Sequence, residues 1–499
     1  MGHAVMEAIA AGVAEHREEI IEGILEEFLA LCRIPHQSGH EEAISLYLLQ
    51  RLEEMGFESS RDENFNVIAD IPATAGLEDR PRVVLQAHMD MVVATEPGKF
   101  DPQQDHVCPV IEGDLLHTDG RSSLGADNGI GVAAILYAVG RPRLPHGPLR
   151  VIFTSCEEVG LRGAKLLDPA VLRDVRYLIN LDGFHADRAV VGCMSGKRET
   201  FFHPMRTVQT MPGSVGIEVE LSGFRGGHSG EDIGAHRCNA IRLMAEMLYC
   251  VKEKNFPMEI AAMDGGTGAN VIPRTCAATL AVSADERLAV ERRIQEEFCW
   301  VTAAYKTEEH TPHLEFREVP VPRRVWSDSV TRDVLEAIRL ENNGVYTLSR
   351  QFRGAVGGSS NLGRIFSDEH KVELQIMTRC ESDDIEKKIL HQHTQVAKRY
   401  GFSMGIVGYD AWHQEALNPL TEAVEDAYEE NYHRRIKVMA AQVGLEPAYF
   451  HTKAPWLTMV TLGADIEDAH STSERVKLSS LETMFRMMAG ALIRVAYHG

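Results

Sequence analysis

Apolar residues in the N-terminal part of the chain recur in ways that predict alternating helices and short buried strands. Residues 5–56 carry apolar side chains at helical spacing, with a break near Pro35. Residues 126–140 predict a further helix that begins near Asp127. Short apolar runs predict three buried strands, at 82–87, 148–155 and 176–182. This alternation is typical of an α/β domain.

Ionisable side chains stand at the ends of all three predicted strands. His88 follows the first strand, and the pair Glu157 and Glu158 follows the second. Asp182 ends the third. In open α/β sheets, ligands bind at the carboxyl ends of the strands. These strand ends therefore indicate one shared functional site.

The middle of the chain changes from buried runs to an alternation of apolar and polar residues. The alternation predicts strands at 215–222, 276–283 and 371–378, with helical stretches at 235–254 and 284–297. This combination predicts an antiparallel sheet with helices on one face.

The C-terminal part returns to the first pattern. It predicts a helix at 419–432, an apolar strand at 456–463 that leads towards His470, and a last helix at about 478–497. The α/β pattern is therefore interrupted by the central region.

We predict two domains from these patterns. Residues 1–195 and 408–499 are expected to form a discontinuous α/β domain, a three-layer α/β/α arrangement around a mostly parallel central sheet. Residues 196–407 are expected to form an inserted α+β domain.

Composition narrows the functional classes. The 499-residue chain carries a formal net charge of −22, which argues against a nucleic-acid-binding protein with a basic surface. Its nine cysteines include no Cys-x-x-Cys pair, so a thiolate zinc site is not expected and the thiols should be reduced. No apolar run is long enough to span a membrane, and the N-terminal segment lacks the pattern of a secretory signal. We therefore expect a cytoplasmic protein.

The first candidate motif is His88-Met89-Asp90. Residues two apart on a strand share a face, and a metal-bound imidazole usually donates its other ring N–H to a carboxylate. A surface histidine near an aspartate would give the same letters, so this motif alone does not define a site.

The other candidates are also ambiguous when each is taken alone. Asp127 lies where a glycine-rich loop enters an apolar helix, which also fits a helix cap. Glu157 and Glu158 repel each other, and a cation beside them would remove that penalty, although a solvated loop pair is common too. Asp182 alone fits a strand cap, and a single histidine such as His470 usually has no special role.

The order and setting of these side chains resemble a known family. The chain resembles the co-catalytic zinc metallopeptidases of the aminoacylase, carboxypeptidase and dipeptidase clan, and most of all the aminoacyl-histidine (cytosol non-specific) dipeptidase type. The resemblance covers nearly the whole chain. It rests on the segments QAHMDMV, LGADNGIG, EEVGLRGA, VGCMSGKRE, GGHSGEDI, GANVIPR, GGSSNLG and AHSTSE.

The resemblance implies two divalent metal ions, zinc first, with manganese or cobalt as alternatives. It implies that Asp127 bridges both ions. His88 and Asp182 would complete one metal site, and Glu158 and His470 would complete the other. Ligands of these types suit catalytic zinc with an open position.

The implied catalytic residues are Glu157 and Asp90. Glu157 would be the general base for a metal-bridging hydroxide that attacks the amide carbonyl, and Asp90 would orient His88. The implied reaction is hydrolysis of a dipeptide, with Xaa-His or broad specificity.

The inserted domain resembles the lid of the family, which binds small peptides and could mediate a homodimer. His228 would help to bind the tetrahedral oxyanion, and Arg379 would bind the substrate carboxylate. An arginine on a strand is also typical of a surface ion pair. The other implied substrate-binding residues are Asn270, Arg274, Asn361 and Glu446, of which Asn270 could equally be a structural turn residue.

Two positions depart from the family pattern. The family usually has a histidine in the segment that here reads Gln442-Val443-Gly444-Leu445-Glu446, and an aspartate where this chain has Cys156. Neither change removes an implied metal ligand or the base. We expect an active enzyme whose specificity differs if the first segment shapes the substrate pocket.

Other functions remain open at this stage. The chain could be a deacylase, a desuccinylase or an aminopeptidase of the same clan, or a relative that binds metal or peptide without turnover. A serine hydrolase is disfavoured because no G-x-S-x-G motif occurs. A single-zinc H-E-x-x-H protease is disfavoured because His40-Glu41 is not followed by a second histidine at the required spacing.

Overall fold

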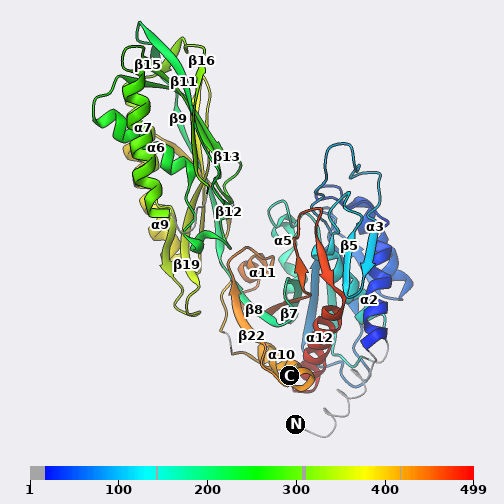
Figure 1. Cartoon of the computed structure of the whole chain (residues 1–499). Helices are drawn as coiled ribbons and strands as arrows, with labels where there is room; N and C mark the ends of the chain where they lie inside the picture. The colour runs from blue at the N-terminus through cyan, green and yellow to red at the C-terminus, as the bar shows by residue number, and fades with distance from the viewer. Residues whose placement is uncertain (1–16, 142–143, 306–310, 416, 499) are drawn as a thin grey trace. The chain divides into compact units, whose positions relative to one another are not determined.

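The computed structural model describes residues 17–141, 144–305, 311–415 and 417–498, and the chain divides into two compact units (Figure 1). Unit 1 comprises Met1–Cys193, Trp412–Ala441 and Leu445–Gly499, and unit 2 comprises Met194–Ala411 and Gln442–Gly444. The chain thus enters unit 2 a second time, at a short segment that the sequence pattern did not predict. The part of the first expected helix at residues 5–16 lies outside the described residues.

Unit 1 is a mixed α/β structure. Its helices are α2 (Arg17–Leu31), α3 (Glu42–Glu54), α4 (Ala126–Val139), α5 (Arg162–Leu166), η1 (Pro169–Leu172), α10 (Pro419–Tyr432), α11 (Pro447–Lys453) and α12 (Leu478–His498). Its strands are β1 (Glu58–Arg61), β2 (Val67–Ile71), β3 (Arg82–His88), β4 (Pro109–Glu112), β5 (Leu115–Thr118), β6 (Leu149–Thr154), β7 (Val175–Gly183), β8 (Arg188–Cys193), β22 (Lys437–Ala441), β23 (Thr458–Gly463), β24 (Ile466–Glu467) and β25 (Arg475–Lys477).

Eight of these strands form the central sheet in the order β1-β2-β6-β3-β7-β23-β8-β22. Its centre, β6-β3-β7-β23, is parallel, whereas β1, β2 and β6 pair antiparallel at one edge. All but the first residue of β3 are buried, as expected for a strand covered on both faces. The predicted α/β fold class with a mostly parallel core is confirmed.

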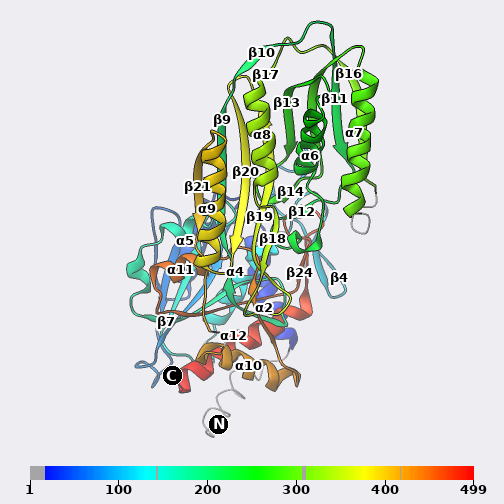
Figure 2. The same ribbon diagram turned by 90° about the vertical axis from the view of Figure 1, so that its left-hand side faces the viewer.

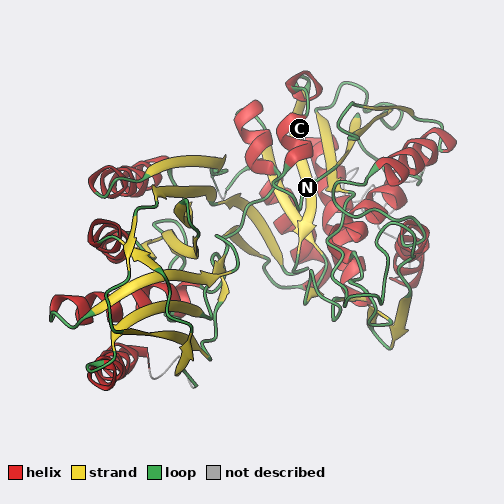
Figure 3. Ribbon diagram, turned by 90° about the horizontal axis from the view of Figure 1, so that it is seen from above, coloured by secondary structure: helices red, strands yellow, loops and turns green. Residues whose placement is uncertain are grey.

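Helices cover this sheet, and Figure 3 shows them on both sides of its strands. Helix α4 packs against β3 and β7, and α12 packs against α2, α4 and β23. Helix α4 lies close to β7 at Gly131, because a Cβ at this position would lie only 2.7 Å from the Leu181 carbonyl oxygen. Within the described residues, no helix combines the length and apolar character that a membrane span requires.

The described residues of unit 2 form an antiparallel sheet and four long helices. Its strands are β9 (Ser195–Pro204), β10 (Thr207–Gln209), β11 (Ser214–Ser222), β12 (Gly227–His228), β13 (Met258–Gly266), β14 (Val271–Ile272), β15 (Cys276–Ser283), β16 (His313–Val319), β17 (Arg324–Trp326), β18 (Gly344–Leu348), β19 (Val356–Ser367), β20 (Lys371–Cys380) and β21 (Ser403–Tyr409). Its helices are η2 (Ile233–Ala235), α6 (Ala240–Glu253), α7 (Arg287–Thr302), η3 (Ala303–Tyr305), α8 (Asp328–Leu340) and α9 (Asp383–Arg399).

The nine-stranded sheet of unit 2 has the order β16-β11-β15-β13-β19-β20-β9-β21, with β18 paired to β19. Figure 2 shows helices α8 and α9 beside its long strands. Helix α8 begins where the Ser327 hydroxyl accepts the Val330 N–H, and it buries Val330, Val334 and Ile338 at helical spacing in the core of the unit.

A buried group of ionisable residues links the sheet of unit 2 to two of its helices. Glu199 of β9 accepts hydrogen bonds from Thr378 of β20, at 2.6 Å, and from Nδ1 of His393 on α9, at 2.7 Å. The other ring nitrogen of His393 lies 3.2 Å from Glu341, at the end of α8. Burial raises the pKa of Glu341 to about 8. Burial lowers the pKa of His393, but Glu199 and Glu341 outweigh this and raise it above its ordinary value.

We expect this group to make unit 2 less stable as the pH rises. Both folded-state pKa values exceed the ordinary ones, which are 4.5 for Glu341 and 6.5 for His393. At pH values between each group's ordinary and folded-state pKa, the folded protein therefore binds more protons than the unfolded protein. The stabilisation is complete below pH 4.5 and is lost as the pH approaches 8. Relative to wild type, Glu341→Gln should gain on the order of 2 kcal/mol in free energy of unfolding between about pH 5 and pH 8.

Urea unfolding of wild type and Glu341→Gln at pH 5 and pH 8 measures this difference in free energy of unfolding. Unit 1 is identical in the two proteins, so its own pH dependence cancels when their free energies are subtracted. Glu369→Gln is the control, because the Glu369 side chain is 86% exposed, and it should follow wild type. Parallel pH profiles of wild type and Glu341→Gln would contradict the prediction.

Candidate active site

Three neighbouring parallel strands of unit 1 end at the candidate residues. The order β6-β3-β7 places His88, at the end of β3, between the loop that follows β6 and the end of β7. The loop after β6 carries Glu157 and Glu158, and β7 carries Asp182 at its penultimate position. The sheet thus gathers residues that are far apart in the sequence.

Asp127 enters this group from the start of α4. Gly125 immediately precedes the helix with φ 70°, a left-handed conformation that favours glycine. The Asp127 side chain is buried, and its two carboxylate oxygens face different partners. Oδ1 lies 3.1 Å from Nε2 of His88, and Oδ2 lies 3.0 Å from Nε2 of His470.

Each imidazole also faces a second carboxylate. His88 Nε2 lies 3.4 Å from Asp182 Oδ1, and His470 Nε2 lies 2.7 Å from Glu158 Oε1. The donor atoms of His88, Asp127 and Asp182 lie within 4.8 Å of one another, and so do those of Asp127, Glu158 and His470. Two ligand triads that share Asp127 fit two divalent cations held by nitrogen and oxygen donors.

The electrostatics of the cluster favour cations. Burial raises the pKa of Glu158 to about 7, that of Asp182 to about 6, and that of Glu157 well above its ordinary value. Burial lowers the pKa values of the imidazoles, but neighbouring carboxylates raise that of His470 to about 10 and that of His88 well above its ordinary value. Crowded carboxylates repel one another, so positive charge among them is stabilising.

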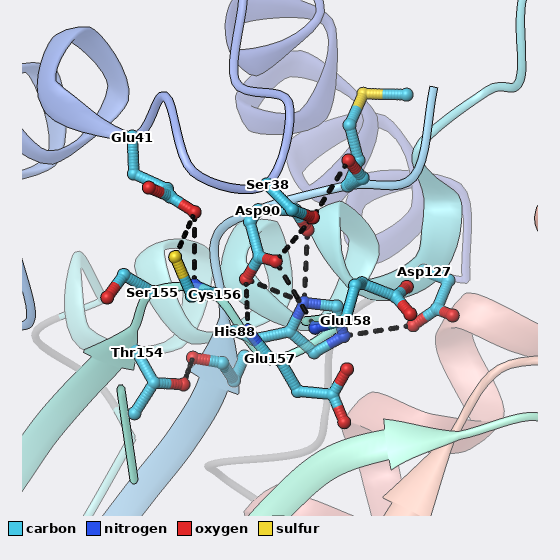
Figure 4. Close-up of polar contacts among 12 residues, drawn as sticks. Ser38, Glu41, His88, Asp90, Asp127, Thr154, Ser155, Cys156, Glu157 and Glu158 are labelled. Atoms are coloured by element: carbon cyan, nitrogen blue, oxygen red, sulfur yellow. Dashed lines mark hydrogen bonds and ion pairs between the residues drawn. The ribbon is translucent and has the colours of Figure 1, made fainter. Parts of the chain in front are cut away.

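Asp90 connects the ligands to the loop after β6 (Figure 4). His88 Nδ1 lies 3.0 Å from the Asp90 carbonyl oxygen and 3.5 Å from its carboxylate, which leaves Nε2 directed at the cluster. The same carboxylate accepts the N–H groups of Glu157, at 2.9 Å, and Glu158, at 3.3 Å, and the Ser38 hydroxyl, at 2.7 Å. Asp90 therefore contacts the His88 imidazole and also binds the backbone N–H groups of two glutamates.

Glu41 anchors the same loop from another side. Its Oε1 accepts the N–H of Gly39 at 2.7 Å, the N–H of Cys156 at 3.1 Å and the Cys156 thiol at 3.1 Å. Cys156 is left-handed, with φ 48°, a conformation that aspartate tolerates better than most residues. The Cys156 thiol is thus held by a buried carboxylate, next to Glu157.

Glu446, which the sequence predicted to line the substrate site, lies in a buried network of unit 1. Its side chain is fully buried in unit 1, where one oxygen accepts hydrogen bonds from Gln86 Nε2, at 2.5 Å, and from the Thr154 hydroxyl, at 2.7 Å. Gln86 in turn accepts a bond from Asn180 at 2.6 Å. This buried network joins β6, β3 and β7. Glu446 also interacts electrostatically with His88, Asp182 and Asp90 of the cluster.

Unit 2 brings together four of the residues expected to bind substrate. β12 pairs with β14 so that His228 is opposite Val271, next to Asn270. The Asn361 amide donates at 2.9 Å to the carbonyl groups of both Ala269 and Val271. A Cβ at Gly226 would lie 2.3 Å from Arg274 Cγ, so Arg274 packs against the loop that precedes His228.

Arg379 lies on the same face of the sheet as Asn361. It is opposite Ser359 in the register of β19 and β20, and Asn361 is two residues further along β19. Arg379 is 5% exposed, and its Nη1 donates to the Tyr409 hydroxyl at 3.2 Å. In the described parts of the chain, no carboxylate forms an ion pair with this buried guanidinium. The surroundings therefore suit an anionic ligand.

Gln442 lies in the short segment that returns to unit 2. With its amide oriented to satisfy both neighbours, its nitrogen donates to the Gly230 carbonyl at 2.9 Å and its oxygen accepts the Val356 N–H at 3.3 Å. Gln442 therefore joins the His228 loop to the start of β19.

The chain is similar to known proteins over most of its length. A model of peptidase family M20/M25/M40 matches residues 84–494. The cytosol non-specific dipeptidase of Escherichia coli strain K12 is 31% identical over 467 residues, which cover 91% of this chain and 93% of that protein.

Solved structures share the fold. The crystal structure of aminoacylhistidine dipeptidase from Vibrio alginolyticus matches with a TM-score of 0.81 at 29% identity, over 94% of this chain and 96% of that one. Human carnosine dipeptidase 1 matches with a TM-score of 0.52 at 13% identity, over 98% of this chain and 99% of that one, a likeness of fold alone.

Proposed function

Because the chain belongs to peptidase family M20/M25/M40, we propose that it is a two-metal dipeptidase that accepts histidine among the second residues of its substrates. One observation carries the two-metal part of the proposal. The two oxygens of Asp127 face two separate histidine–carboxylate pairs, at 3.1 Å and 3.0 Å from the imidazole nitrogens. The dipeptide part rests on the names of the two relatives that match over most of the chain.

The proposed metal ligands divide between two ions. Asp127 would hold both, His88 and Asp182 would hold one, and Glu158 and His470 would hold the other. Zinc suits imidazole and carboxylate donors, although manganese and cobalt are also accepted by such sets. When bound, the ions would activate a water molecule and polarise the scissile carbonyl.

Glu157 is the proposed general base. Burial raises its pKa well above the ordinary value, so its carboxylate is a stronger base than that of an exposed glutamate. The water oxygen that loses a proton to Glu157 would bond to the scissile carbonyl carbon. The proton held on a Glu157 oxygen would then pass to the amine nitrogen as the C–N bond breaks, so that atoms and charges balance. The hydrogen bond from the Glu157 N–H to Asp90, at 2.9 Å, supports a fixed position for this base.

Two residues of unit 2 are proposed to bind the substrate. His228 Nδ1 lies 3.3 Å and 3.4 Å from the N–H groups of Gly230 and Glu231, so the neutral ring carries its proton on Nε2 and can donate to an oxyanion. Arg379 is proposed to bind the C-terminal carboxylate of the dipeptide through its planar guanidinium. Asn270, Arg274 and Asn361 are proposed to support these contacts.

Two further expectations stay predictions. One is a homodimer that forms through residues 196–407, and the other is a cytosolic location, for which the name of the E. coli relative is the support.

Removal and return of metal test the proposed function. We expect the chelated protein to be inactive, and zinc or manganese to restore cleavage of a panel of dipeptides that includes histidine at the second position, with about two ions bound per chain. The same dipeptides with an amidated C-terminus should be poorer substrates, because they lack the carboxylate for Arg379.

N-acyl amino acids complete the panel. Turnover of these compounds alone would show a deacylase of the same family and contradict dipeptidase activity. A protein with two ions bound and no turnover of any compound would contradict the enzymatic function itself.

A further inference from the structure

Glu474 is a buried carboxylate in the C-terminal part of unit 1. It lies between β24 and β25, four residues after His470, and it is 2% exposed. Its Oε2 accepts the N–H groups of Leu124, at 2.8 Å, and Gly125, at 3.0 Å. Its Oε1 accepts the N–H of Asp127 at 3.2 Å. One side chain thus binds three backbone donors of the loop that carries Asp127.

The loop needs such an acceptor. The left-handed conformation of Gly125 turns successive N–H groups towards the same point, and these groups are buried. Buried N–H groups are almost always paired, because an unpaired donor loses its hydrogen bond to water. The carboxylate of Glu474 satisfies all three, and both of its oxygens are used.

We propose that Glu474 is a positioning residue that fixes the backbone of Asp127 and thereby aims both of its carboxylate oxygens at the two metal sites. This inference rests on the proposed function, in which Asp127 bridges two ions. Glu474 also belongs to the loop that carries His470, whose Nε2 lies 3.0 Å from Asp127 Oδ2. Glu474 therefore sets the position of Asp127 relative to His470, although Glu474 and the Asp127 loop are about 350 residues apart in the sequence.

The charge and shape of Glu474 are both required in this arrangement. Glu474→Gln keeps the size of the side chain but places an NH₂ group opposite at least one backbone N–H, where two donors face each other. The Asp127 loop should then shift, and the bound ions should lose part of their ligand geometry. Residues that orient metal ligands typically change metal affinity by about 10-fold to 100-fold when they are altered.

The test measures zinc affinity by competition with a chelator in wild type, Glu474→Gln and Glu467→Gln. We expect a loss of about 10-fold to 100-fold for Glu474→Gln. Glu467→Gln is the matched control, because Glu467 precedes His470 on the same segment and its side chain is 64% exposed. The control should retain wild-type affinity. Circular dichroism of the metal-free proteins establishes that each is folded.

A double-mutant cycle separates positioning from general stabilisation. If Glu474 acts through Asp127, adding Glu474→Gln to Asp127→Asn should reduce zinc affinity by less than about 3-fold. A merely structural residue would weaken binding equally in both backgrounds. If Glu474→Gln does not fold, Glu474→Asp keeps the charge on a shorter side chain and takes its place in the same measurements, with a loss of about 10-fold expected.

Unchanged zinc affinity in a folded Glu474 variant would overturn the inference, and so would equal losses in both arms of the cycle. A failure of the proposed function would give a different result. If Asp127 did not bridge two ions, Asp127→Asn would bind zinc as tightly as wild type, and this variant alone would show it.

Discussion

Replacing Glu157 by glutamine is expected to lower kcat by about two to four orders of magnitude while two metal ions stay bound per chain. The amide is nearly the same size as the carboxylate but cannot take a proton from water. Steady-state kinetics on a cleaved dipeptide, together with metal analysis of the purified variant, measures both parts of the prediction. Little change in KM is expected, because Glu157 is not proposed to bind the ground state of the substrate.

The neighbouring residue supplies a matched control. His88, Glu157 and Glu158 also form a possible ligand triad, so the geometry alone allows Glu157 to be a metal ligand. Glu158→Gln changes the same chemical group one residue away, and it should weaken metal binding, because Glu158 lies 2.7 Å from His470. Loss of metal from Glu157→Gln instead would show that Glu157 is a ligand and would contradict its assignment as the base.

The sequence predicted the elements whose signals are local. The helix expected at 419–432 coincides with α10, because Asn418 accepts the N–H groups of Leu420 and Thr421 and Pro419 fits the first turn. The strands that carry the candidate ligands are continuous apolar runs, which is the pattern of strands buried on both faces. The order of these strands and the polar residues at their ends indicated one shared site.

Other elements carry misleading local signals. Strand β19 contains the sequence VGGSSNLGRIFS, whose glycines and serines are typical of a loop. The structure explains these small residues, because a Cβ at Gly363 would lie 2.1 Å from the Gly268 carbonyl oxygen. The helix expected from residue 235 begins instead at Ala240, since the Asn239 side chain accepts the N–H groups of Ile241 and Arg242 and so caps it.

The supporting residues of the site could not be found from sequence, because their partners are distant. Ser38 and Glu41 lie in a short connection between helices, where no periodicity distinguishes them from solvent-exposed residues. Glu474 lies four residues from His470 within a motif that the family resemblance includes, so the motif was the only signal. Glu446 was expected to contact substrate, and its burial beside Gln86 and Thr154 could not be predicted from the sequence either.

Asp127→Asn is expected to remove most of the bound metal from both sites and to lower kcat/KM by about three orders of magnitude or more, equivalent to about 4 kcal/mol. Asparagine keeps one carboxamide oxygen, but its NH₂ group cannot bind a cation. The variant therefore loses the oxygen that serves one site and the charge that serves both. Metal analysis after gel filtration and kinetics at fixed zinc concentration measure the two effects.

Asp182→Asn is the comparison that makes this result specific. Asp182 belongs to only one of the two shared triads and lies 3.4 Å from His88, so its loss should release about one ion and leave the Glu158–His470 side occupied. The two variants remove the same charge from the same buried cluster, so a general electrostatic effect would lower their metal content equally. Equal metal content in the two variants would mean that Asp127 does not bridge the ions. If Asp127 is a shared ligand, Asp127→Asn should bind about one ion fewer than Asp182→Asn.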